Sequence, residues 1–236
     1  MPRKEGGQSK TVCGRFNLIN SPEIQWLCEE LGISLYSHQS SADIAPGGKI
    51  AIIHNVGGTR KVSDAIWWLF LEHSTLKPNY KYVSFNSRSD KLHSKRAIAY
   101  TPYRESRCLI PASGFVEGLG DRKTYHKIEL EDAAIAFGGL YKEYLNPETG
   151  EVVYSASIIT LPPLIPQWND IHLKSMPMML DFKDKDLVKK WLDPRLQDVD
   201  FFEELLEPKV RKPMKVTKVD KPSKWNPIED SFMITN

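Results

Sequence analysis

Cysteine is scarce in this sequence, and its spacing fits neither a disulfide framework nor a cysteine-ligated metal. The three cysteines are Cys13, Cys28 and Cys108, and no two of them form a CxxC pair. Because three thiols cannot all pair with one another, we expect reduced cysteines, as in a cytoplasm. The six histidines show neither HxH nor HxxxH spacing. The sequence therefore gives no support for a bound metal.

Long apolar runs and glycine-rich phosphate loops are also missing. No stretch approaches the roughly 20 apolar residues of a membrane-spanning helix. The charged N-terminus lacks the apolar segment of a secretory signal. Neither GxxxxGK nor GxGxxG occurs, so we expect no nucleotide cofactor. The net charge of +2 permits an anionic partner without requiring one.

The composition is that of a folded globular domain. Hydrophobic residues make up 41% of the 236 residues and charged residues 26%. Residues 1–12 are polar and without hydrophobic period, so we expect a disordered leader or a mis-assigned start there. Residues 13–236 contain no linker-like stretch and are predicted to form one domain.

Local patterns predict strands in the middle of the chain and helices toward its ends. A helix is expected to begin at Ser21, with Pro22 and Glu23 in its first turn, and to stop at Gly32. The other expected elements are strands at 50–54, 61–70, 125–130, 133–140, 141–145, 152–160 and 214–219 and helices at 184–192 and 199–206. Turns are expected at 55–58, 131–132 and 146–150. The predicted class is α+β, a mostly antiparallel, curved or barrel-like sheet flanked by helices.

Two segments in the first half contain side chains that can carry chemistry. Cys13 precedes a glycine and Arg15, and a nearby cation lowers a thiol pKa. The ordinary alternative for a lone cysteine is a small buried residue. The amide of Asn86 offers a hydrogen-bond donor and an acceptor, and the guanidinium of Arg88 can donate two parallel hydrogen bonds to a phosphate. Both also fit an ordinary polar loop.

Two further candidates lie in the second half. Glu117 comes two residues after Phe115, and a shared strand face would put the carboxylate in an apolar setting suited to acid–base chemistry. The alternative is a solvated glutamate at a strand end. His172 follows an Asn-Asp turn, and histidine titrates near neutrality. The remaining histidines, at 38, 54, 73, 93 and 126, are expected to be surface or core residues.

The C-terminal region, residues 209–224, is rich in lysine and arginine. Together with Trp67, Trp68 and Arg88 it suits a groove for a nucleic-acid backbone with base-stacking platforms. A solvated, lysine-rich segment is an equally good interpretation.

Short motifs follow one another in a specific order from residue 13 onward. They are 13–16 (CGRF), 44–46 (IAP), 67–69 (WWL), 86–89 (NSRS), 107–117 (RCLIPASGFVE), 136–140 (AFGGL), 157–160 (SIIT), 171–172 (IH) and 176–177 (MP). As an ordered set they resemble the SRAP family (SOS response-associated peptidase, the abasic-site processing proteins). The resemblance implies an α+β fold around a barrel-like sheet.

It also implies a function in the DNA damage (SOS) response. Such proteins sense abasic sites in single-stranded DNA and link to them covalently through an N-terminal cysteine. The implied nucleophile and other catalytic positions are Cys13, Asn86, Glu117 and His172, and the suggested DNA contacts are Arg15, Trp67, Trp68, Arg88 and Thr160. We expect no metal, no cofactor and no membrane, and a cytoplasmic monomer.

The sequence departs from the SRAP pattern in three places. Gly118 stands where the family usually has tryptophan, next to Glu117. His172 is one residue further from Met176 than in the commonest HxRMP form, and Lys174 replaces the arginine. The third departure is the leader, which makes the cysteine internal.

The leader matters because the implied chemistry needs a free N-terminal cysteine. Its amine can form a Schiff base with the aldehyde of an opened abasic sugar, and its thiol can then close a thiazolidine ring. An α-amine with a pKa near 7.8 is about 10–20% neutral at pH 7. Either Val12 is a GTG start codon, read as an initiator Met that is then removed, or the chain cleaves its own Val12–Cys13 bond with help from Glu117 or His172. We favour the first hypothesis.

Two other functions stay open. A thiol peptidase would use Cys13 as nucleophile and His172 as base, and would cleave peptides without DNA. A non-catalytic module would bind single-stranded DNA in a salt-dependent way without forming a crosslink.

Overall fold

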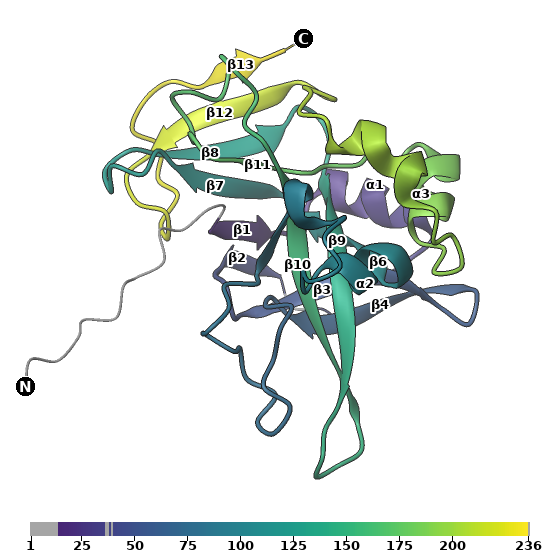
Figure 1. Ribbon diagram of the computed structural model, residues 1–236. Coiled ribbons are helices and arrows are strands. Elements are labelled where there is room, and N and C mark those ends of the chain that lie inside the picture. The colour runs from purple at the N-terminus through teal and green to yellow at the C-terminus, as the bar shows by residue number, and fades with distance from the viewer. Residues whose placement is uncertain (1–13, 36–37, 39, 236) are drawn as a thin grey trace, which may run out of the picture.

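Two β-sheets dominate the computed structural model, which describes residues 14–35, 38 and 40–235 (Figure 1). A six-stranded sheet has the order β13-β12-β8-β7-β1-β2, and a seven-stranded sheet contains the path β11-β10-β4-β3-β6-β9 with β5 beside β10. The strands are β1 (Arg15–Leu18), β2 (Ser41–Ile44), β3 (Lys49–Val56), β4 (Thr59–Ile66), β5 (Asn86–Arg88), β6 (Arg107–Ala112), β7 (Gly114–Gly118), β8 (Tyr125–Leu130), β9 (Ile135–Leu145), β10 (Val152–Leu161), β11 (Met176–Pro177), β12 (Met214–Val219) and β13 (Phe232–Ile234).

The seven-stranded sheet closes on itself. Strand β9 pairs with β10 as well as with β6, so β10, β4, β3, β6 and β9 form a five-stranded barrel. Strand β10 runs parallel to β4 and β5, and the other strand pairs are antiparallel. The predicted α+β class with a mostly antiparallel, barrel-like sheet is confirmed.

Helices are short and lie around the sheets (Figure 1). They are α1 (Pro22–Leu31), α2 (Tyr100–Glu105) and α3 (Lys185–Trp191), with 3₁₀ helices η1 (Ser89–Lys91) and η2 (Val199–Leu206). The segment 199–206, predicted to be helical, is therefore a 3₁₀ helix. Within the described part of the chain, no helix has the length and apolar character needed to cross a bilayer.

Helix α1 follows directly from its local sequence. The Ser21 hydroxyl accepts a hydrogen bond from the Ile24 amide, which caps the first turn. Gly32 ends the helix in the left-handed conformation, at φ 61°. The buried face consists of Ile24, Leu27 and Leu31. The predicted start, stop and apolar spacing are confirmed.

The two predicted hairpins also form. Strands β3 and β4 are paired along their whole length, with Lys49 opposite Ile66 at one end and Val56 opposite Thr59 at the other. The turn between them contains two glycines with positive φ. Strands β9 and β10 flank the turn at 146–150. The turn at 131–132 has another role, because β8 belongs to the six-stranded sheet and β9 to the barrel. That turn carries the chain from one sheet to the other.

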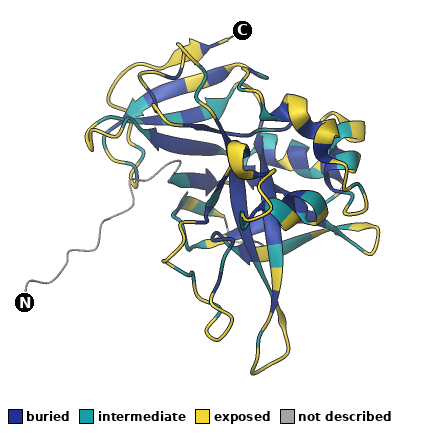
Figure 2. Cartoon of the chain, viewed as in Figure 1, coloured by how far each residue is buried: buried dark blue, intermediate teal, exposed yellow. Residues whose placement is uncertain are grey.

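Aromatic side chains join the two sheets in the core. Phe16 of β1 makes edge-on contacts with Trp67 and Phe137, at centroid distances of 4.8 and 5.8 Å. Phe115 of β7 contacts Phe137 at 5.6 Å and Trp168 at 6.5 Å. All five rings are buried, and dark blue marks the buried residues of the two sheets in Figure 2. The inner faces of β1 and β7 thus point toward the barrel.

Candidate active site

Strand β7 presents Glu117 on the face that packs into the core. Side chains two residues apart on a strand share a face, so Glu117 lies on the same side as Phe115. Their exposed fractions are 1% and 0%. The condition on which acid–base chemistry was predicted, a carboxylate in an apolar setting, is therefore met.

His172 lies against the end of the same strand. Its Nδ1 is 2.6 Å from the carbonyl oxygen of Gly118 and 3.9 Å from Oε2 of Glu117. Because a carbonyl oxygen only accepts, Nδ1 donates this hydrogen bond, and a neutral ring leaves Nε2 without a proton. Nε2 is buried and has no hydrogen-bond partner among the described residues. His172 can therefore take up a proton at Nε2.

Asn86, Arg88 and Thr160 come together through a parallel strand pair. Strand β5 runs beside β10 so that Asn86 is opposite Ile158 and Arg88 is opposite Thr160. Asn86 is half-buried, and Thr160 is 2% exposed. The Arg88 side chain is 71% exposed and donates two hydrogen bonds of 2.9 Å to Asp90. Arg88 is thus accessible to an anion, and Thr160 is not.

Arg15 lies on the outer face of β1. Its neighbour Phe16 points into the core, and successive residues of a strand alternate between faces. Arg15 forms an ion pair with Asp43, whose Oδ1 also accepts a hydrogen bond of 3.3 Å from the Trp225 indole. The Arg15 side chain keeps 30% of its surface exposed. One carboxylate therefore connects β1, the end of β2 and the C-terminal segment.

The two tryptophans expected to stack on bases are core residues in this structure. Trp67 is 0% exposed and Trp68 is 6% exposed. Their indole N–H groups donate to backbone carbonyls of Phe85, at 2.9 Å, and Asn79, at 3.3 Å. Stacking requires an exposed ring face, and neither ring offers one as placed. This corrects the expected position of both side chains.

Beside Trp68 and Phe70, two tyrosines that sequence reasoning missed expose aromatic surface. Tyr80 is 75% exposed, and its ring contacts Trp68 edge-on at 5.1 Å. Tyr82 is 51% exposed and contacts Phe70 at 5.4 Å. Their alternation with lysine in the segment 80–82 (YKY) is the signal that could have indicated a basic, aromatic surface.

The predicted nucleophile, Cys13, lies outside the described residues, but the residue after it is described. In the antiparallel pair of β1 and β7, Arg15 is opposite Val116 and Phe16 is opposite Phe115. One further step along both strands puts Gly14 opposite Glu117. The chain thus enters the fold beside the buried carboxylate.

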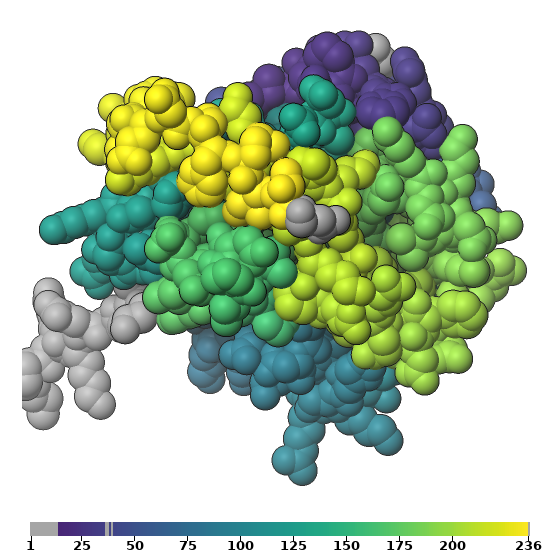
Figure 3. Space-filling model, turned by 90° about the horizontal axis from the view of Figure 1, so that it is seen from above, coloured from purple at the N-terminus to yellow at the C-terminus, as the bar shows by residue number. Residues whose placement is uncertain are grey.

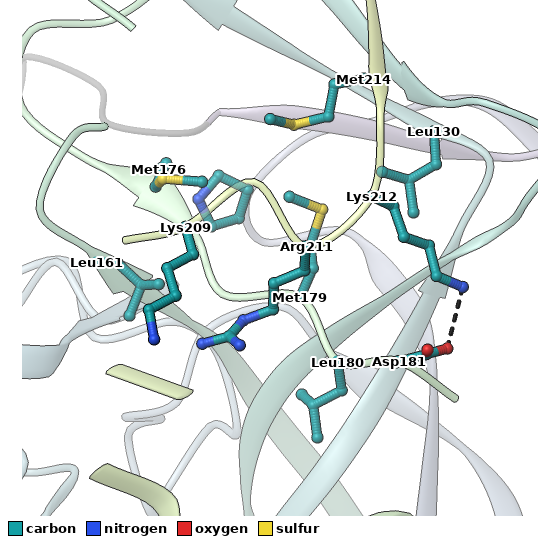
Figure 4. Close-up of a pocket in the computed structure, with 11 residues that line it drawn as sticks. Leu130, Leu161, Met176, Met179, Leu180, Asp181, Lys209, Arg211, Lys212 and Met214 are labelled. Atoms are coloured by element: carbon teal, nitrogen blue, oxygen red, sulfur yellow. Dashed lines mark ion pairs between the residues drawn. The ribbon is translucent and has the colours of Figure 1, made fainter. Parts of the chain in front are cut away.

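The basic C-terminal segment is largely held by local partners. Figure 4 shows a pocket beside β11 that includes Met176 and has Lys209, Arg211 and Lys212 on its lining. Lys212 is 3.0 Å from Asp181, and Lys209 is paired with the glutamates 204 and 207. Local pairing of this kind favours the interpretation of a solvated segment. The C-terminal residues, in yellow, form part of the face seen in Figure 3.

No metal centre is built by the side chains of residues 14–35, 38 and 40–235. No group of three or more histidine, cysteine, aspartate or glutamate side chains is arranged there to hold an ion.

A family model provides the deciding comparison, because the model described as SOS response associated peptidase (SRAP) matches residues 12–222. This chain belongs to the SRAP family. Abasic site processing protein YoqW of Bacillus subtilis (strain 168) is 32% identical over 206 residues, which cover 84% of this chain and 87% of YoqW. Abasic site processing protein YobE of the same organism is 30% identical over 205 residues, 84% of this chain and 89% of YobE.

Solved structures support the SRAP fold. A Bordetella bronchiseptica protein superimposes with a TM-score of 0.68 at 19% identity, covering 89% of this chain and 100% of that chain. A Bacteroides thetaiotaomicron protein gives a TM-score of 0.64 at 21% identity, covering 88% of this chain and 92% of that chain. At these identities the likeness concerns the fold alone.

The unusual glycine of this SRAP protein has a structural explanation. A Cβ atom on Gly118 would be 3.1 Å from two ring carbons of Tyr125. The Tyr125 ring thus occupies the space beside residue 118 where a larger side chain would begin. The extra residue after His172 does not separate it from β7, because its ring bonds to the Gly118 carbonyl.

Proposed function

We propose that this chain senses abasic sites in single-stranded DNA and traps them as a covalent thiazolidine crosslink through Cys13, in the DNA damage response. The relatives named abasic site processing proteins support the substrate class. The observation that carries the proposal is the pair of Glu117 and His172, 3.9 Å apart beside the entry point of Gly14. We further propose that the protein acts in the cytoplasm, as a monomer and without a cofactor.

The reaction has two steps, a condensation and an addition. The α-amine of Cys13 attacks the aldehyde carbon of the opened sugar, and loss of one water molecule gives an imine. The thiol then adds to the imine carbon, forming the C–S bond, and its proton goes to the ring nitrogen. No electrons are lost or gained overall, and water is the only product released.

The buried pair supplies the proton transfers that these steps need. Nε2 of His172 accepts the proton that the attacking group loses, because Nδ1 is committed to Gly118. Glu117 delivers a proton to the departing hydroxyl group, since an apolar setting favours the neutral form of a carboxyl group. Asn86 orients the opened sugar or the terminal amine through its amide. All three side chains are at least half-buried, which limits competition by water.

DNA binding is proposed to use the exposed groups around this pair. Arg15 and Arg88 bind phosphates, and the exposed ring of Tyr80 offers a base the stacking face. In this arrangement Trp67 and Trp68 pack in the core beneath the DNA-binding surface and do not contact the base. The buried Thr160 contributes to DNA binding indirectly, through its position opposite Arg88 in the pair of β5 and β10.

The proposal requires Cys13 to be the first residue of the working protein. We favour translation from Val12, read as an initiator Met that is removed, over self-cleavage of the Val12–Cys13 bond. The codon of Val12 tests this, because any codon other than GTG excludes it. Mass spectrometry of chains that begin at Met1 tests the alternative, which predicts loss of residues 1–12 during incubation.

A single-stranded oligonucleotide with one abasic site tests the function. A chain beginning at Cys13 is expected to give a slower band on a denaturing gel, whereas Cys13→Ala gives none. Cys28→Ala is the matched thiol control and should behave like the unaltered chain. Glu117→Gln and His172→Ala are expected to slow formation by about 10²-fold or more.

The same gel distinguishes the rival functions. A heat-stable band that needs an intact abasic sugar supports the proposal. DNA retention on a native gel without any band under denaturing conditions indicates a binding module. Cleavage of added peptides without a heat-stable DNA band indicates a thiol peptidase, and the absence of that band in either case would overturn the crosslinking function.

A further inference from the structure

A row of polar residues crosses the six-stranded sheet at the level of Glu117. In the pairing of β7 with β8, Glu117 is directly opposite His126. In the pairing of β8 with β12, His126 is directly opposite Lys218. Directly opposite residues of antiparallel strands project from the same face of the sheet. The three side chains are therefore neighbours in a line that starts at the buried carboxylate.

The inner end of this row faces the core. Ile128, two residues after His126 on the same face, is 0% exposed and is opposite Phe115. His126 itself is 7% exposed, and its Nδ1 is buried without a hydrogen-bond partner among the described residues. A buried ring nitrogen that lacks a partner is unusual and calls for an explanation.

The outer end of the row reaches the surface. Lys218 forms an ion pair with Glu229, and the side chains are 32% and 57% exposed. The C-terminal residues, in yellow, form part of the outer surface in Figure 3. The row thus runs from an enclosed carboxylate, through one imidazole, to a solvated ion pair.

His126 is suited to remain neutral in this setting. Burial has the largest effect and lowers its pKa, and Lys218 lowers it further. Glu229 and Asp170 oppose this by raising the pKa. A neutral imidazole can accept a proton on one ring nitrogen and release another from the second nitrogen.

We propose that His126 is a positioning and proton-transfer residue of this site, connecting Glu117 to solvent. The inference rests on the proposed function, in which Glu117 and His172 exchange protons with the reacting groups. Both are buried, at 1% and 3% exposure, and Nδ1 of His172 is occupied by Gly118. After Glu117 has given its proton to the departing hydroxyl group, the N–H of neutral His126 returns a proton to it through a water molecule, and the other ring nitrogen of His126 takes up a proton from solvent. Charge and atoms balance, and no other reactant is needed.

Crosslinking kinetics with the chain that begins at Cys13 give the first test. His126→Phe is expected to slow the single-turnover rate about tenfold at saturating DNA and to leave DNA affinity unchanged. Because a titrating group is removed, the pH profile of the crosslinking rate should also change. Added imidazole should restore part of the lost rate. His126→Gln, which keeps a polar side chain, should show the same defect. His93→Phe, at a histidine whose side chain is 46% exposed, is the matched control.

NMR gives a test that does not depend on crosslinking. Glu117→Gln changes the side chain opposite His126, so the ring resonances of His126 should shift, while those of the exposed His93 stay in place. Unchanged His126 resonances, or crosslinking by both His126 variants at the normal rate and pH profile, overturn the inference. Failure of the unaltered chain to crosslink instead overturns the proposed function, and the NMR result then still decides whether the two side chains are coupled.

Discussion

At the scale of single residues, one carboxylate holds the Arg15 guanidinium next to the point where the chain enters the fold. Asp43 accepts from Arg15 and from the Trp225 indole. A DNA phosphate that binds Arg15 has to compete with this carboxylate. The neutral amide of asparagine would still accept from Trp225 but would hold the guanidinium less strongly.

We therefore expect Asp43→Asn to bind single-stranded DNA more tightly. One additional phosphate contact steepens the dependence of log K on log salt by about 0.7 for a single strand. Fluorescence anisotropy over a range of salt concentrations measures this, with Cys13→Ser in every chain to prevent crosslinking. Asp186→Asn, at an exposed carboxylate of α3, controls for net charge. Equal slopes for the two variants would contradict the role of Asp43.

Local sequence predicts only some of these residues. The two-residue spacing of Phe115 and Glu117 is compatible with a carboxylate in an apolar setting, but it fits a solvated glutamate at a strand end as well. The sequence offers Trp68 as a ring on which bases stack, but a tryptophan side chain can also pack in a core. Only the fold of the surrounding segment decides which of the two it does. His126 has no local signal, because its neighbours Glu117 and Lys218 come from other strands.

At the scale of elements, the buried Arg107 fastens two helical segments to the barrel. Its guanidinium donates five hydrogen bonds of 2.8 Å to backbone carbonyls, those of Tyr103, Arg104, Trp191, Asp193 and Leu196. Burial lowers its pKa to about 10, so it stays charged near neutrality. The end of α2 and the turn after α3 therefore meet at the start of β6.

Replacing Arg107 by lysine should destabilise the protein. Lysine has three donors and no planar fork, so several buried carbonyls would lose their partners at about 1–3 kcal/mol each. We expect the free energy of unfolding, measured by urea denaturation, to fall by at least about 3 kcal/mol. Arg195→Lys is the control, because that side chain is 88% exposed. A loss no larger than in the control would show that the five bonds contribute little.

Elements with local signals were predictable, and those fixed by distant partners were not. Helix α1 has its cap and its stop in its own sequence. Strands β6 and β7 were not predicted, because their residues are almost all buried and show no alternation. The change of sheet between β8 and β9 depends on pairing with β6 and β10, which no local pattern encodes.

At the scale of the whole molecule, the closed barrel contains a histidine that must stay uncharged. His54 of β3 is 0% exposed, and its Nε2 is 2.9 Å from the Ser63 hydroxyl of β4. Its ring contacts Tyr141 of β9 at 4.8 Å and Tyr154 of β10 at 5.0 Å. One imidazole thus meets side chains from three other barrel strands, and burial lowers its pKa from 6.5 to about 4.

This makes the stability of the fold depend on pH in a defined direction. Between pH 6.5 and 4, His54 binds a proton in the unfolded chain but not in the folded one. The free energy of unfolding should therefore fall as the pH is lowered through this range, by on the order of 3 kcal/mol from this group. His54→Phe lacks the group, so urea denaturation at pH 7 and pH 4.5 should show a smaller loss than in the unaltered chain. His73→Phe, at an exposed histidine, should keep the full loss; equal losses in all three chains would mean that acid weakens the barrel at other groups.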